Sequence, residues 1–91
     1  MKAQIVVARN VRRLRVGLGL SQEVLAVDSA VDRTYVSRVE RGLENPTVAV
    51  LERLAKALRV EIAEFFDQGH ATRPVRPLPG GRRSTKAKRR P

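Results

Sequence analysis

The segment Ser21–Gly42, SQEVLAVDSAVDRTYVSRVERG, constrains the fold of this chain more than any other stretch. It reads as two short helices, at about 22–28 and 33–41, joined by a three-residue turn. Ser21 and Asp32 stand where N-cap side chains accept hydrogen bonds from the first helical turn. Gly42 stands where the second helix should end. The spacing therefore predicts a compact helix pair with little freedom between its members.

The second helix of this pair is polar on one side and apolar on the other. Val36 and Val39 are spaced i, i+3 and should face inward. Glu40 is expected to form an internal salt bridge or a capping contact. The outward positions are Arg33, Thr34, Ser37 and Arg38. A short, polar helix braced by another helix has the geometry that enters the major groove of DNA, so we expect these four side chains to contact DNA.

The rest of the sequence predicts three more helices. From about residue 4 to 16, Val7, Val11 and Leu14 recur at helical spacing, the arginines between them are expected to be solvated, and Gly17 should terminate the helix. Thr47 should cap a fourth helix, and a short fifth helix is expected from residue 62 to 66. The apolar stripe of the fourth helix comprises Val48, Leu51, Leu54, Ala55 and Leu58. The chain is therefore predicted to be all-α, with five helices.

Positive charge is concentrated at one end. Residues 1–69 carry 11 basic and 9 acidic side chains, a net charge of +2, whereas residues 70–91 carry 8 basic side chains and no acidic ones, a net charge of +8. We therefore expect one folded domain over residues 1–69, followed by a disordered basic tail over residues 70–91. Such a tail suits phosphates, an anionic surface or simple solubility, so charge alone does not choose the partner.

Several classes of function are disfavoured. There is no cysteine, so thiolate metal sites and disulfides are excluded, and no stretch approaches the ~20 apolar residues of a membrane span. No catalytic constellation appears, and the lone His70 has no second metal ligand near it in sequence. We expect a cytoplasmic, non-enzymatic protein that needs no metal or cofactor and does not bind a membrane.

A series of motifs resembles one known family. GLSQEVLA, RTYVSRVERG, NPT and LERLAKAL, followed by Val60 and the pair Phe65–Phe66, are similar in order and spacing to the helix-turn-helix family of phage lambda repressor and xenobiotic-response-element regulators. The resemblance covers about residues 4–66. It implies a compact five-helix lambda-repressor-like bundle, with the third helix as recognition helix and dimers bound to near-palindromic operators.

The resemblance also suggests site residues. Gln22 resembles a family glutamine that meets a phosphate and braces the recognition helix. Tyr35 is ambiguous, since its ring can lie against the bundle while its hydroxyl reaches a phosphate. Asn45 lies in a loop whose backbone amides approach DNA in the family. Ala30 departs from the usual turn glycine, and adoption of a left-handed conformation there would cost ~1 kcal/mol.

Two apolar surfaces are candidate contacts with proteins. Val24 and Val27 stand where the family usually carries charge, and they can form a small exposed pair. The fourth and fifth helices offer more apolar groups than so small a bundle can bury. The candidate dimer surface there comprises Leu51, Val60, Ile62, Phe65 and Phe66.

These features together predict a sequence-specific transcriptional regulator, most often a repressor, that binds an inverted-repeat operator as a homodimer through the major groove of double-stranded DNA. One alternative is an antitoxin that holds a toxin and represses their shared operon; a partner protein of another regulatory kind also remains open. Another alternative is a nonspecific nucleoid-type DNA binder driven by the basic tail.

Overall fold

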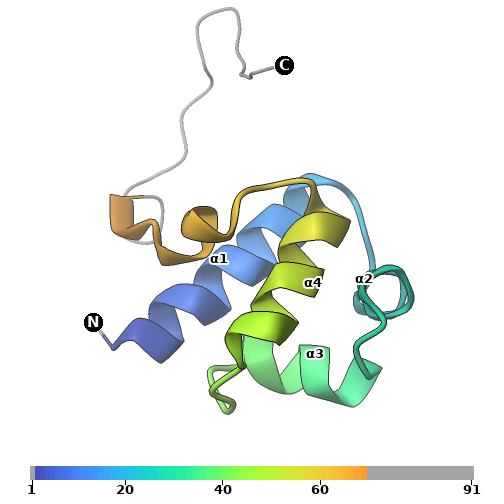
Figure 1. Cartoon of the computed structure of the whole chain (residues 1–91), viewed down its shortest axis with the longest axis horizontal. Helices are drawn as coiled ribbons and strands as arrows, with labels where there is room; N and C mark the ends of the chain where they lie inside the picture. Colours follow the sequence, from blue (N-terminus) through green and yellow to red (C-terminus); the bar gives the residue numbers. More distant parts are fainter. Residues whose placement is uncertain (1, 70–91) are drawn as a thin grey trace, which may run out of the picture.

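The computed structural model describes residues 2–69, so the predicted basic tail and His70 lie outside the described residues. Four α-helices and one 3-10 helix follow one another along the chain (Figure 1). Their bounds are α1, Ala3–Gly17; α2, Gln22–Ser29; α3, Arg33–Glu40; α4, Val48–Leu58; and the 3-10 helix η1, Ile62–Phe66. The all-α prediction is confirmed, and the fifth predicted helix is of the tighter 3-10 kind.

The helices form a bundle around α1 and α4. In Figure 1, α4 crosses in front of α1, α3 lies along the lower edge, and α2 stands at the right. α1 packs against η1, α3 and α4, whereas α2 packs against α3 and α4. Because α3 touches both α1 and α2, its position is fixed from two sides.

Each of the five elements contributes a side chain with 0% exposure to the core. These are Val11, Leu25, Val36, Leu54 and Phe65. The predicted inward positions in α1 and α3 pack as expected, and Leu25 and Ala26 of α2 and Val31 of the turn are buried as well. Val48 is the exception in the predicted stripe of α4, because it is the first residue of that helix and remains exposed.

The predicted N-caps are confirmed at three helices. The Ser21 Oγ accepts a hydrogen bond from the Val24 N–H at 3.0 Å, and the Thr47 Oγ1 accepts one from the Val50 N–H at 3.1 Å. The Asp32 carboxylate accepts from the N–H groups of Thr34 and Tyr35 at the start of α3. Each cap satisfies donors that a helix terminus would otherwise leave unpaired.

All four α-helices end with the same backbone motif. The last turn is followed by a residue with positive φ, and the next residue donates its N–H to a carbonyl five positions earlier. The positive-φ residues are Gly19, Ala30, Gly42 and Arg59, with φ of 72°, 57°, 74° and 59°. α1 ends at Gly17 as predicted, but the residue with positive φ that follows the helix is Gly19 rather than Gly17.

A buried asparagine joins the end of the described chain to α1. The Asn10 Nδ2 donates to the backbone oxygens of Phe65 and Asp67, both at 2.9 Å, and its Oδ1 accepts from the Nε and Nη2 of Arg13. Burial lowers the pKa of Arg13, and the nearby Glu64 and Asp67 oppose that effect. Asn10 is fully buried, so these bonds satisfy an amide that would otherwise be costly inside the core.

Replacing Ala30 by glycine should stabilise the protein. Ala30 has φ 57° and ψ 38°, a left-handed conformation that glycine adopts without the steric penalty of a Cβ. Part of the gain is offset by the greater freedom of glycine in the unfolded chain, so we expect the free energy of unfolding to rise by up to ~1 kcal/mol in urea denaturation.

Ala49 provides the matched control, because it is exposed and lies inside α4. Ala49→Gly should lower the free energy of unfolding by up to ~1 kcal/mol. If both substitutions destabilised the protein equally, Ala30 would not be strained.

Candidate DNA-binding surface

The outer face of α3 is held in place by its own buried side. Val36 and Val39 are 0% and 1% exposed, and they seat the helix against the core. The exposed side presents Arg33 and Thr34 to solvent and leaves Ser37 and Arg38 half-buried. The structure thus places the four predicted contact residues on the solvent side of one short helix, and their contact with DNA stays a prediction.

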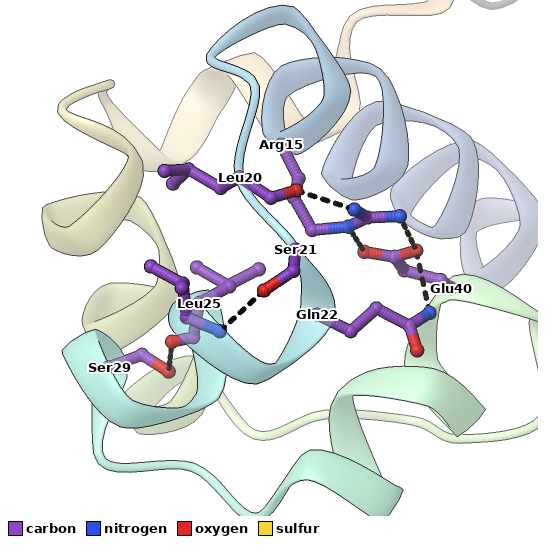
Figure 2. Close-up of polar contacts among 8 residues, drawn as sticks. Arg15, Leu20, Ser21, Gln22, Leu25, Ser29 and Glu40 are labelled. Atoms are coloured by element: carbon purple, nitrogen blue, oxygen red, sulfur yellow. Dashed lines mark hydrogen bonds and ion pairs between the residues drawn. The ribbon is translucent and has the colours of Figure 1, made fainter.

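A buried ion pair ties α3 to α1 (Figure 2). The Arg15 Nε donates to the Glu40 Oε2 at 2.6 Å, and the Arg15 Nη2 donates to Oε1 at 3.0 Å. The Arg15 Nη1 donates to the Leu20 carbonyl at 2.7 Å. The side chains of Arg15 and Glu40 are only 11% and 2% exposed, and the hydrogen bonds with Glu40 raise the pKa of Arg15.

This pair confirms one prediction and corrects another. Glu40 is the internal salt-bridge partner that the sequence indicated, whereas Arg15 is buried rather than solvated. The signal for Arg15 was present in the sequence, because Val7, Val11 and Arg15 are spaced i, i+4, i+8 on the inward face of α1. The other arginines of α1 are less buried: Arg9 and Arg12 are exposed, and Arg13 is intermediate.

Gln22 joins the same network from α2. Its Nε2 donates to the Glu40 Oε1 at 3.1 Å, and Figure 2 shows the amide turned toward the end of α3. The ion pair therefore bridges α1, α2 and α3 at one point. Gln22 braces the recognition helix as the resemblance implies, while its contact with a phosphate stays a prediction.

The loop after α3 is anchored on both sides. The Gln4 Nε2 of α1 donates to the Gly42 carbonyl at 2.6 Å, and a Cβ added at Gly42 would lie 2.7 Å from the Ile5 Cδ1. Arg38 reaches this loop as well, since its Nε donates to the Glu44 Oε2 at 2.7 Å. Asn45 is exposed at the outer end of the loop.

The burial of individual side chains bears on two predictions, one for Tyr35 and one for the candidate dimer surface. Tyr35 packs against the core, as expected for its ring, and a contact of its hydroxyl with phosphate stays a prediction. The five residues predicted to form a dimer surface divide into buried and partly exposed side chains. Leu51 and Phe65 are 5% and 0% exposed and belong to the core of this chain, so they are corrected to core residues. Val60 and Ile62 are half-buried, and Phe66 is 48% exposed.

An open pocket lies between α4 and η1, and two of these apolar side chains, Val60 and Ile62, line it. Its lining comprises Glu52, Arg53, Ala55, Lys56, Val60, Glu61 and Ile62. The pair Val24 and Val27 is exposed on α2, as expected. Within residues 2–69 the structure contains no group of three or more side chains placed to hold a metal ion, and none of the helices there has the length and apolar character needed to cross a membrane.

Comparisons with known proteins agree with this geometry. A family model described as "Helix-turn-helix" matches residues 11–65. The HTH-type transcriptional regulator SlrR of Bacillus subtilis is 40% identical over 63 residues, which are 68% of this chain and 41% of SlrR. A hypothetical transcription factor of Neisseria meningitidis is 49% identical over 55 residues, which are 60% of this chain. The chain spans 52% of the length of that second relative.

Two solved structures are matched over most of their own length. The restriction-modification controller protein C.AhdI from Aeromonas hydrophila has a TM-score of 0.68 and 43% identity, over 69% of this chain and 96% of that one. The controller protein C.Esp1396I, solved as a tetramer in complex with its natural 35 base-pair operator, has a TM-score of 0.67 and 36% identity, over 72% of this chain and 87% of that one.

Removing the carboxylate of Glu40 should destabilise the fold strongly. Glu40→Ala leaves the buried Arg15 guanidinium without a counter-charge, and breaking a buried pair in this way costs about 3–5 kcal/mol. Chemical denaturation measures the loss. Glu44→Ala is the control, because it breaks an ion pair of half-exposed side chains and should cost at most ~1 kcal/mol. Similar small losses for both variants would contradict the structural role assigned to Glu40.

Proposed function

The chain belongs to the helix-turn-helix family, and on that premise we propose that it is a transcriptional regulator that reads an inverted-repeat operator as a homodimer. The observation that carries the proposal is the seating of α3. Its apolar side is buried, its last turn is tied to α1 and α2 through Glu40, and its polar residues face solvent. A helix presented in this way can enter the major groove without rearrangement.

The chemistry of the exposed face suits base recognition. Arginine can donate two parallel hydrogen bonds to guanine O6 and N7, and threonine and serine can bond to bases or phosphates. Arg33 and Thr34 lie at the start of α3, where a recognition helix contacts base edges, and Ser37 and Arg38 follow one turn later. Gln22 and Asn45 flank α3 and are proposed to contact phosphates.

Dimerisation follows from the symmetry of an inverted repeat. Two recognition helices must lie about 34 Å apart to read successive major grooves. We propose that Val60 and Ile62, which line the pocket between α4 and η1, form the contact between two copies together with Phe66, the exposed last residue of η1. A partly apolar patch on a small monomer is a usual mark of such an interface.

Similarity to C.AhdI and C.Esp1396I favours a controller-type regulator, and the operator complex of C.Esp1396I supports DNA as the ligand. The relatives described above bear the names of regulators and controllers, which supports a function without catalysis. Repression is the proposed outcome of binding, since a small protein on an operator can exclude other proteins from it. We propose a cytoplasmic location, where the operator would be accessible.

Selection of binding sites from a pool of random duplexes, at a stated salt concentration, tests the proposal. We expect enrichment of an inverted repeat, because two symmetric α3 helices would contact equivalent half-sites. The same selection with a chain ending after Gly69 separates specific from charge-driven binding. The shortened chain should enrich the same repeat with lower affinity and a weaker dependence on salt.

Two outcomes contradict the proposal. Full-length protein that enriches no sequence would favour the nonspecific nucleoid-type alternative. A shortened chain that loses all DNA binding would show that the basic residues 70–91, rather than α3, carry the interaction.

A further inference from the structure

The structure contains two arginine–glutamate pairs near α3, and they differ in how much of the guanidinium they use. Arg15 is engaged through Nε, Nη1 and Nη2. Arg38 donates only its Nε, to the Glu44 Oε2 at 2.7 Å. The first pair is buried, while the side chains of Arg38 and Glu44 are 43% and 29% exposed. All three nitrogens of Arg15 donate to the protein, whereas the outer edge of the Arg38 guanidinium stays available.

We propose that Glu44 is a positioning residue that orients the Arg38 guanidinium toward a guanine of the operator and thereby sets sequence specificity. This inference rests on the proposed function, since it concerns how the same surface reads DNA. A carboxylate on Nε leaves the edge formed by Nη1 and Nη2 open. That edge carries the parallel donors that match guanine O6 and N7.

The loop holds Glu44 firmly enough for this purpose. The Leu43 N–H donates to the Arg38 carbonyl at 2.9 Å, directly before Glu44. Gly42 adopts φ 74° and accepts a hydrogen bond from Gln4 of α1. The Thr47 hydroxyl caps α4 shortly after Glu44. Glu44 is thus placed between two anchored points, so its carboxylate restricts the long Arg38 side chain before DNA arrives.

Glu44 should favour binding to the operator over binding to random DNA. Restricting a flexible side chain in advance reduces the entropy lost when it binds a base. The negative charge of Glu44 also repels phosphates, which weakens binding to any DNA regardless of sequence. The first effect increases the ratio of operator affinity to random-DNA affinity, whereas the second lowers both affinities and leaves that ratio unchanged. If Glu44 instead masked Arg38, its removal would improve operator binding more than random binding, so the two roles differ in sign.

The test compares full-length Glu44→Ala and Glu44→Gln with the unaltered protein on three duplexes at one salt concentration. The duplexes are the selected operator, the operator altered at the base pair where Arg38→Ala relaxes discrimination, and a random sequence. For Glu44→Ala we expect discrimination between the first two duplexes to fall on the order of fivefold. Affinity for random DNA should be unchanged or higher. Glu44→Gln keeps an acceptor for Nε and should retain part of the discrimination.

Two further variants test whether Glu44 acts through Arg38 rather than through its charge alone. Asp28→Ala removes an equal charge from an exposed position on α2 and should leave discrimination unchanged. The double variant Glu44→Ala with Arg38→Ala should discriminate no worse than Arg38→Ala alone, because Glu44 acts through Arg38. The unfolding midpoint of Glu44→Ala, measured alongside, should stay close to that of the unaltered protein, since this ion pair is half-exposed.

The inference is overturned if Glu44→Ala keeps the discrimination of the unaltered protein, or if it gains more affinity for the operator than for random DNA. Equal losses from Glu44→Ala and Asp28→Ala would assign the effect to net charge and would also overturn it. An unaltered protein with no operator preference would contradict the proposed function itself. The operator preference of the unaltered protein is therefore measured first, because it tests the proposed function separately from the role of Glu44.

Discussion

The hydrogen-bonded ion pair of Arg15 and Glu40 is the interaction on which the arrangement of α1, α2 and α3 depends. It joins the last turn of α1 to the last turn of α3, and Gln22 at the start of α2 shares the same carboxylate. Either charge buried alone would carry a desolvation penalty of several kcal/mol. The pair is therefore favourable only when the three helices are docked together, which couples the fold to the position of α3.

That coupling explains how a small chain can hold the exposed, polar face of α3 rigidly. An eight-residue helix such as α3 is too short to be stable alone in water, so its order must come from packing and capping. Val36 and Val39 supply the packing, Asp32 caps the first turn, and Gly42 allows the last turn to close. Because the buried ion pair of Arg15 already holds α3 in place, the half-exposed Arg38 is available for interactions outside the protein.

Much of this fold could be predicted from local sequence, because caps, apolar spacing and turn glycines act over a few residues. Ser21, Asp32 and Thr47 illustrate this, as does the inward side of α3. The polar contacts of Arg15 and Asn10 could not be predicted in this way, because their partners Glu40 and Phe65 lie 25 and 55 residues away and only packing brings them together. Local sequence placed the end of α1 at Gly17, and the structure agrees, but the positive-φ residue is Gly19, where the Leu20 N–H bonds to the Arg15 carbonyl. The candidate DNA contacts rest on the outward face of α3, which local spacing does specify, whereas the link from Arg38 to Glu44 depends on the path of the loop.

The contacts described above hold α3 in one position in the DNA-free protein, as the proposed function requires. Residue-resolved hydrogen exchange of the DNA-free protein tests it most directly, because exchange reports the free energy needed to open each hydrogen bond. Amides in the last turn of α3, such as those of Val39 and Glu40, should open with the same free energy as those of Val11 in α1 and Leu54 in α4. Exchange of the α3 amides through a much cheaper local opening, while α1 and α4 stay protected, would contradict it.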